Sequence, residues 1–177
     1  MGFINDKTGE LFRASCEIGA YLAGADEKTI QRAGKFGLSL GINYQVFDDL
    51  VDSFEKQENS DKPLGSDWGT GKLTLPFILL RQAASVDDKE ELDRFVLGTD
   101  SRISPQQCRL RISQLFEKYC ILNACVEYLE QSYVHTNGLL NEFTNLSLRN
   151  DLNSFLHRFS DKFAKLSEFK TSNFLAV

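Results

Sequence analysis

Asp48, Asp49 and Asp52 are the residues with the most evident chemistry in this chain. On a helix, residues three and four positions apart lie on the same side, so these carboxylates can share one cation. Carboxylate oxygens suit Mg²⁺, which binds through a few carboxylates together with waters and substrate phosphates. Taken alone, the three residues have an alternative interpretation, a solvated acidic patch at a helix end.

A basic stretch with several glycines follows the acids. It contains Lys62, Lys72 and the glycines Gly65, Gly69 and Gly71. Glycine lets the backbone approach a ligand closely, and a lysine ammonium is a point charge for phosphate. Upstream, Lys7 and Thr8 open another predicted helix and add one cation and one hydroxyl. Acids next to a basic loop predict a site for Mg²⁺ and a diphosphate.

The elements that position these residues are predicted to be helical nearly throughout. Apolar residues recur every three or four positions, no strand alternation persists, and no internal repeat is visible. We expect helices over 8–23, 27–55, a short apolar segment from 76, 88–97, 105–137 and 145–166. The chain is therefore predicted to be all-α.

Helix ends are marked by residues that favour caps. Asp26 and Ser104 are expected N-caps, with Pro105 at the first helical position. The acidic doublet Asp87-Asp88 is expected to provide an N-cap and first-turn charge for the helix that follows it.

The inner faces of three helices are read from the apolar periodicity. The residues expected in the core are Phe36, Leu40, Tyr44, Phe47, Leu110, Leu115, Tyr119, Leu122, Val126, Leu129, Leu148, Leu152, Phe155, Leu156, Phe159 and Phe163. Gly34, Gly37 and Gly41 let either another helix or a prenyl chain come close to the second helix. We favour helix packing.

Four ordered motifs carry a resemblance to a known family. They are Lys7-Thr8-x-x-Leu11-Phe12, Gly41-x-x-Tyr44-Gln45-x-x-Asp48-Asp49-x-x-Asp52, Lys62-x-x-Gly65-x-Asp67 and Gly71-Lys72-x-Thr74-Leu75-Pro76. The chain resembles trans-isoprenyl diphosphate synthases, the polyprenyl synthetase family, and its Thr-Leu-Pro ending is most similar to geranylgeranyl and long-chain polyprenyl members. The resemblance implies an antiparallel helix bundle of the isoprenoid synthase type, with this chain forming the C-terminal half as a single domain over 1–177.

The resemblance also implies an activity and a set of site residues. The family condenses an allylic prenyl diphosphate with isopentenyl diphosphate and uses Mg²⁺. Asp48 and Asp52 correspond to metal ligands, and Asp49 to a weaker ligand acting through water.

The basic and polar residues of the motifs correspond to the allylic diphosphate site of the family. Lys7, Lys62 and Lys72 would contact the diphosphate, with Thr8 and Gln45 as polar neighbours near the reacting carbon. Lys7, Thr8, Gln45 and Lys72 are therefore the catalytic candidates, and Gln45 also counts as substrate-binding.

Family members are about twice as long, and their first aspartate-rich motif precedes the position of Lys7. We therefore expect that this chain is not active alone and works as a homodimer, or with a complete synthase or a missing N-terminal half. The alternative is a non-catalytic partner or regulatory subunit of a heteromeric synthase. A terpene cyclase is a weaker reading, because Lys7-Thr8 and the Gly-Lys-x-Thr-Leu-Pro loop indicate the condensing enzymes. The helices around Phe36 to Phe47 are expected to expose apolar surface, so the chain should dimerise, aggregate or need a partner.

Composition bounds the remaining possibilities. The chain has 177 residues, a net charge of −5 and 42% hydrophobic residues, without a stretch long enough to span a bilayer. No basic stripe indicates nucleic-acid binding, and the first residues do not form a secretory signal.

Trp68 either covers the diphosphate loop or anchors it to the core.

The cysteines and histidines are interpreted as structural. Cys16, Cys108, Cys120 and Cys125 lack metal-ligand spacing, and we read them as buried or half-buried thiols in a reducing compartment, either the cytoplasm or an organellar stroma or matrix. His135 and His157 have no ligand partner at helical spacing.

Overall fold

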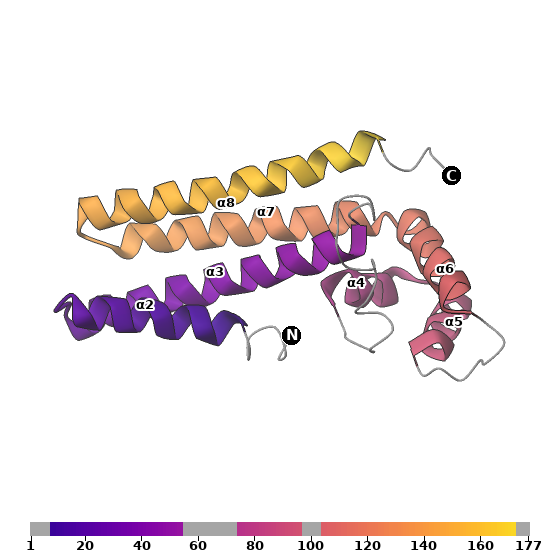
Figure 1. The fold of residues 1–177 in the computed structure, drawn as a ribbon, viewed down its shortest axis with the longest axis horizontal. Coiled ribbons are helices and arrows are strands. Elements are labelled where there is room, and N and C mark those ends of the chain that lie inside the picture. Colours follow the sequence, from indigo (N-terminus) through magenta and orange to yellow (C-terminus); the bar gives the residue numbers. More distant parts are fainter. Residues whose placement is uncertain (1–7, 55–73, 97–103, 173–177) are drawn as a thin grey trace. The chain divides into compact units, whose positions relative to one another are not determined.

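The computed structural model describes residues 8–54, 74–96 and 104–172. Every regular element in these residues is helical, as the apolar periodicity predicts. The elements are α2 (Glu10–Leu22), α3 (Glu27–Phe54), α4 (Leu75–Ala83), α5 (Val86–Val96), α6 (Pro105–Lys118), α7 (Ile121–Leu139), the 3₁₀ turn η4 (Leu140–Glu142) and α8 (Leu146–Ser172) (Figure 1).

The chain forms two compact units. The first comprises Met1–Phe47 and Val126–Val177, and the second comprises Asp48–Cys125. Two of the long helices, α3 and α7, contribute residues to both units.

The first unit is built from α2, most of α3 and α7, η4 and α8. Figure 1 shows α2, α3, α7 and α8 as long helices lying alongside one another. Its core is a cluster in which aromatic rings predominate, formed by Phe36, Leu40, Leu140, Phe143, Leu156 and Phe159. Phe36 and Phe143 meet edge to face with ring centroids 6.5 Å apart, an arrangement that aromatic pairs prefer. This cluster joins α3 to η4 and α8.

The close approach of α2 to α3 depends on glycine. An added Cβ on Gly37 would lie 2.5 Å from the carbonyl oxygen of Phe12, and one on Gly41 would lie 2.9 Å from Cα of Gly9. Both distances are shorter than real Cβ contacts, so the backbones can meet this closely only without a side chain. The expectation that these glycines serve helix packing is confirmed, and the helix they admit is α2.

The second unit contains the end of α3, α4, α5, α6 and the start of α7. Its buried apolar residues are Leu50, Leu75, Phe77, Leu80, Ala84, Leu92, Ile112, Leu115, Phe116, Ile121, Leu122 and Cys125. Phe54 of α3 packs against Phe116 of α6 with ring centroids 5.1 Å apart. The guanidinium of Arg81 donates two hydrogen bonds of 3.0 Å to the carboxylate of Asp93, tying α4 to α5.

The prediction of one helix over 105–137 is wrong, because the chain breaks between α6 and α7. Tyr119 and Cys120 separate the two helices, and Cys120 has a φ of 51°. A left-handed backbone is costly for a residue with a Cβ, and neither glycine nor proline marks the position in the sequence. The predicted core residue Leu110 is 56% exposed. It precedes the buried Leu115 by five positions in α6 and therefore lies on a different side of that helix.

Most predicted helix ends are confirmed. The carboxylate of Asp26 accepts a hydrogen bond of 2.7 Å from the backbone N–H of Thr29 at the start of α3. Ser104 caps α6 in a capping box with Gln107, and Pro105 follows it. Gly24 ends α2 with a φ of 74°, the left-handed conformation expected after a helix C-terminus.

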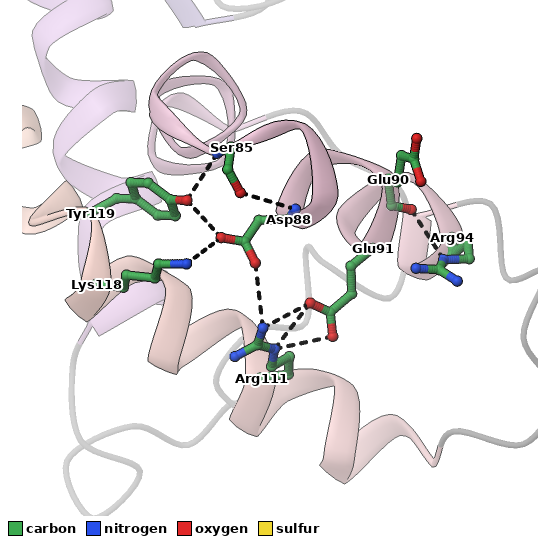
Figure 2. Close-up of polar contacts among 8 residues, drawn as sticks. All are labelled: Ser85, Asp88, Glu90, Glu91, Arg94, Arg111, Lys118 and Tyr119. Carbon is green, nitrogen blue, oxygen red and sulfur yellow. Dashed lines mark hydrogen bonds and ion pairs between the residues drawn. The ribbon is translucent and has the colours of Figure 1, made fainter.

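The acidic doublet differs from its prediction in part. Asp87 and Asp88 do lie in the first turn of α5, but the cap is Ser85, whose hydroxyl accepts from the backbone N–H of Asp88 at 3.3 Å. The Asp88 carboxylate instead binds Lys118 and the Tyr119 hydroxyl, each at 2.6 Å (Figure 2). The hydrogen bond from Lys118, and to a smaller extent the one from Tyr119, lower the pKa of Asp88 to about 2.

Arg111 extends this polar cluster. Its guanidinium lies 2.9 Å from Glu91 and 3.4 Å from Asp88 (Figure 2). The Tyr119 hydroxyl also accepts a hydrogen bond of 2.9 Å from the backbone N–H of Ser85. Charged and polar side chains therefore tie the start of α5 to α6 and to the break that follows α6.

The predicted core is correct in most of its centre and wrong at several edges. Phe36, Leu40, Leu115, Leu122, Val126, Leu129, Leu156 and Phe159 are buried, and Phe47 and Leu152 pack partly buried against the first-unit cluster. Tyr44, Leu148 and Phe155 are exposed by 43%, 37% and 46%. Tyr119 is half-buried because its hydroxyl serves the Asp88 cluster, and the side chain of Phe163 lies outside the described residues.

The apolar surface of the first unit is not where it was expected. Phe36 and Leu40 are buried, so the segment from Phe36 to Phe47 does not present the large exposed face predicted for it. Exposed apolar side chains of this unit include Leu11, Ile18 and Leu22 of α2. Phe36 and Leu40 are buried because α3 packs against α2, α7 and α8. The side of α2 that faces away from α3 is exposed.

Candidate functional site

One edge of α3 carries both the close helix contact and the predicted chemistry. Its residues recur at intervals of three or four and therefore lie on one side of the helix: Gly34, Gly37, Gly41, Gln45, Asp48 and Asp52. The first half of this row is covered by α2. The row then changes from glycine to amide and carboxylate, the residue types that bind cations and polar ligands.

Thr8 and Gln45 are brought together, although they are far apart in sequence. The Thr8 hydroxyl donates a hydrogen bond of 2.6 Å to the side-chain carbonyl of Gln45. A Cβ added at Gly41 would lie 2.9 Å from Cα of Gly9 and 3.0 Å from the Thr8 carbonyl oxygen, so the residues just before α2 lie close to α3 at this point. The two residues predicted as polar neighbours are therefore neighbours of each other.

The three aspartates have different environments within the last turns of α3. Asp48 is exposed, Asp49 is buried with only 2% of its surface accessible, and Asp52 is half-buried. In residues 8–54, 74–96 and 104–172, no three His, Cys, Asp or Glu side chains form a group that could hold a metal ion. Hard oxygen donors spaced along one helix edge fit Mg²⁺ as a partial ligand set that substrate phosphates and waters would complete.

The lysines of the motifs cannot be placed. Lys7, Lys62 and Lys72 lie outside the described residues, as does Trp68. The end of the Gly-Lys-x-Thr-Leu-Pro motif is visible, because Thr74 precedes α4 as its N-cap residue and Pro76 lies in its first turn. The Thr74 hydroxyl oxygen is buried and has no hydrogen-bond partner in the described part of the chain.

Aromatic side chains line up beside Gln45 in the first unit. Tyr44 stacks on Phe12 of α2 with centroids 5.7 Å apart and on Phe159 of α8 with centroids 6.0 Å apart. Phe47 meets the same Phe159 ring edge-on at 6.0 Å. This row joins α2, α3 and α8, and the partial exposure of Tyr44 leaves an aromatic surface next to the polar edge of α3.

The sequence analysis missed a buried polar cluster on the other side of α3. Asn43 and Thr136 are both fully buried, and the Asn43 amide donates a hydrogen bond of 2.9 Å to the Thr136 hydroxyl. Ser39 and Ser132 complete the cluster. The sequence contains two indications of this cluster. Asn43 is a polar residue at a position where the apolar period predicts core, and Ser132 and Thr136 are one helical turn apart.

The cysteines are free thiols with different burial. Cys125 is buried, Cys16 and Cys108 are half-buried, and Cys120 is exposed, which corrects the prediction for that residue. Cys120 is exposed because it forms the sharp junction between α6 and α7. Burial raises the pKa of the Cys125 thiol to about 12 and also raises the pKa of Cys16 and Cys108.

The two histidines are exposed, and one has a hydrogen-bond partner. The ring Nδ1 of His157 lies 3.3 Å from the Tyr133 hydroxyl, linking α8 to α7. His135 lies on α7. Within the described residues, no helix is long and apolar enough to cross a membrane.

Comparison with solved structures identifies the fold. A decaprenyl diphosphate synthase from Rhodobacter capsulatus superposes with a TM-score of 0.76 at 26% identity, over 90% of this chain and 48% of the other. A polyprenyl synthase from Caulobacter crescentus, solved with calcium and isoprenyl diphosphate, gives a TM-score of 0.74 at 27% identity, over 86% and 46%. The all-helical architecture is therefore the isoprenoid synthase fold, as predicted.

Sequence comparison then gives the family. The polyprenyl synthetase family model matches residues 1–133, and the chain belongs to this family. A geranylgeranyl diphosphate synthase from Sulfolobus acidocaldarius is 29% identical over 147 residues, which are 83% of this chain and 43% of that protein. The chain spans less than half the length of these relatives.

Proposed function

We propose that this chain supplies the allylic diphosphate site of a polyprenyl diphosphate synthase that condenses an allylic prenyl diphosphate with isopentenyl diphosphate. The observation that carries the proposal is the single edge of α3 on which Gln45, bonded to Thr8, is followed by Asp48 and Asp52. Carboxylates of this kind bind Mg²⁺ together with substrate phosphates, and the hydroxyl and amide supply polar groups beside them.

In this proposal, Asp48 and Asp52 hold Mg²⁺, and Asp49, which is buried, contributes through water. When bound, Mg²⁺ neutralises the negative charge that develops on a departing diphosphate. The chain's own residues hold and orient the substrate. Thr8 fixes the Gln45 side chain, and the row formed by Phe12 and Tyr44 offers an apolar surface for the first carbons of a prenyl tail.

Lys7, Lys62 and Lys72 complete the proposal as the cations that contact the allylic diphosphate. Their assignment rests on the sequence motifs, because these residues lie outside the described part of the structure. Ammonium groups placed on the diphosphate oxygens would favour its departure by stabilising the charge of the leaving group.

We propose that condensation requires a further part of the synthase, on this chain or on another, since relatives are more than twice the matched length. The alternative is that the chain is a non-catalytic or regulatory subunit of a heteromeric synthase. The acids along α3 favour the catalytic reading, because a purely structural subunit has no need for Asp48 and Asp52 on one helix edge with Asp49 beside them.

Calorimetric titration of farnesyl diphosphate in the presence of Mg²⁺ tests the site. We expect binding by the parent chain that EDTA abolishes, and affinity at least about tenfold weaker in Asp48→Asn and Asp52→Asn, the scale of loss seen when metal-site residues are removed. Asp151→Asn, an exposed residue of α8, makes the same charge change away from the site and should bind like the parent chain.

Absence of heat with the parent chain would contradict the diphosphate site and leave the subunit alternative. Condensation of labelled isopentenyl diphosphate by this chain alone would contradict the requirement for a further part. Activity that appears only after mixing with a complete synthase, and that is lost in Asp48→Asn, would support the catalytic reading.

A further inference from the structure

The buried polar cluster between α3 and α7 has a chemistry that the diphosphate site does not use. It consists of Ser39 and Asn43 on α3, and of Ser132 and Thr136 on α7. All four residues belong to the first unit. Asn43 and Thr136 are completely buried, so their polar groups must be satisfied by one another rather than by water.

The Thr136 hydroxyl organises the cluster. It donates to the backbone carbonyl of Ser132 at 2.9 Å and accepts from the Asn43 amide at 2.9 Å. The Ser39 hydroxyl lies 2.6 Å away. Because the one proton of Thr136 is already used, Ser39 must be the donor, which fills both acceptor positions of the hydroxyl.

The Asn43 side chain is held at both ends. Its amide nitrogen donates to Thr136, and its carbonyl oxygen accepts a short hydrogen bond from the Ser132 hydroxyl. Sliding α3 along α7 by one residue, or rotating it, would break these bonds together and leave buried polar groups unpaired. An apolar contact imposes no such penalty, because apolar side chains can repack in several registers.

The cluster faces away from the acidic edge of the same helix. Asp52 follows Asn43 by nine residues, which is roughly two and a half helical turns. The side chain of Asn43 therefore points to the side opposite that of Asp52. A buried polar residue that fixes helix register in this way is known from coiled coils.

We propose that Asn43 and Thr136 are positioning residues, which lock the register of α3 on α7 and so fix where Gln45 and the aspartates are presented. The role in ligand binding rests on the proposed function, whereas the lock itself does not. The lock predicts one defined register for the native cluster and several for an apolar replacement of the same size.

The test uses an apolar variant that should still fold, Ser39→Ala/Asn43→Leu/Ser132→Ala/Thr136→Val. Replacing all partners together leaves no orphaned buried group, so stability should be kept. Spin labels on Lys35→Cys of α3 and Glu130→Cys of α7, both exposed positions, report the register once the native cysteines are replaced. The parent should give one narrow distance, and the apolar variant a broadened or second distance shifted by roughly 5 Å, one helical turn.

Binding provides the second readout. The apolar variant should bind farnesyl diphosphate with Mg²⁺ about tenfold more weakly than the parent chain, although its melting temperature is unchanged. The conservative variant Thr136→Ser keeps the hydroxyl and should retain both the narrow distance and the affinity of the parent chain, whereas Thr136→Val should lose them.

Each outcome decides a separate question. A single parent-like distance in the apolar variant would overturn the lock, whatever the chain binds. A broadened distance with undiminished binding would overturn the positioning role. If the parent chain binds no diphosphate, the proposed function fails, and the distance measurement alone still decides for or against the lock.

Discussion

At the scale of single residues, Asp88 shows how a charge can serve structure instead of chemistry. Its side chain is 9% exposed and is paired with Lys118 and Arg111. A hydrogen bond from Tyr119 adds to these contacts. The charged form of the carboxylate is therefore favoured in the folded chain, and the pKa falls from 3.8 to about 2.

This lowered pKa has a defined consequence for acid stability. A depressed folded-state pKa stabilises the fold fully above the ordinary value and progressively less as the pH falls towards 2. Asp88→Asn should therefore be less stable than the parent chain at pH 7, and the difference should shrink between pH 4 and pH 2. Denaturant unfolding at three pH values measures it.

Asp87→Asn is the matched control, because Asp87 is the exposed neighbour in the same first turn. It should change stability little and without the same pH dependence. Equal behaviour of the two variants would show that the Lys118 and Tyr119 contacts do not determine the acid response of Asp88.

Single residues also mark where sequence reading succeeds and where it stops. Asp26 and Ser104 could be assigned because capping depends on local residue type. The left-handed Cys120 could not, because cysteine has no preference for this conformation that its sequence position would reveal. Asn43 was missed because its partners are remote in sequence.

At the scale of elements, the order of the helical segments followed from periodicity, but the break that divides the predicted helix 105–137 into α6 and α7 did not. The residues around Tyr119 continue the apolar period of α6 into α7, so the sequence shows no interruption there. The end of α8 lies six residues beyond its predicted limit of Leu166, at Ser172. The close approach of another helix to α3 could be anticipated, because glycines at helical spacing allow close packing, but the sequence did not show that this helix is α2.

The α2–α3 contact predicts opposite effects of the same substitution at different glycines. Gly37→Ala and Gly41→Ala would each force an added methyl against the backbone of α2, and each should destabilise the chain by about 1–3 kcal/mol, the cost of overpacking. Thermal or denaturant unfolding measures the change. Gly41→Ala should also weaken diphosphate binding, because it displaces Thr8 from Gln45.

Gly138→Ala is the control for this prediction. Gly138 lies in α7, and an added Cβ would meet no atom within 4 Å. The substitution should stabilise the chain by about 0.5–1 kcal/mol through the helix preference of alanine. Destabilisation at Gly138, or none at Gly37, would argue against tight packing as the cause.

At the scale of the whole molecule, an apolar face on α2 remains exposed. Leu11, Ile18 and Leu22 are 65%, 57% and 77% exposed and lie on one side of the helix. The nearby charges are occupied within α2, where Arg13 pairs with Glu10 at 2.6 Å and with Glu17 at 2.8 Å. Such a face is typical of a surface that another helix covers.

We therefore expect the isolated chain to self-associate at micromolar concentration, which corresponds to an association free energy of roughly −8 kcal/mol. Ile18→Lys/Leu22→Lys should shift it towards monomer in sedimentation velocity, because charged groups would have to be buried. Val134→Lys changes an equally exposed apolar residue of α7, 69% exposed, and should leave association unchanged. A monodisperse parent monomer would contradict the expectation.

Of the candidate site, the sequence could predict only the arrangement that follows from helical spacing. Gln45 and the aspartates share an edge of α3 because helical spacing alone puts them there. The pairing of Thr8 with Gln45 depends on how α2 packs, and the sequence suggested it only through family resemblance. The placement of Lys7, Lys62 and Lys72 remains a prediction.

The glycine contact also restricts which variants of this chain can arise. Every replacement of glycine by another amino acid adds a Cβ, which would strike the backbone of Phe12 at Gly37 and that of Gly9 at Gly41. We therefore expect substitutions of Gly37 and Gly41 to be poorly tolerated. Change there would require a compensating shift of the whole first helix, so we expect them to stay fixed while the exposed side of α2 drifts.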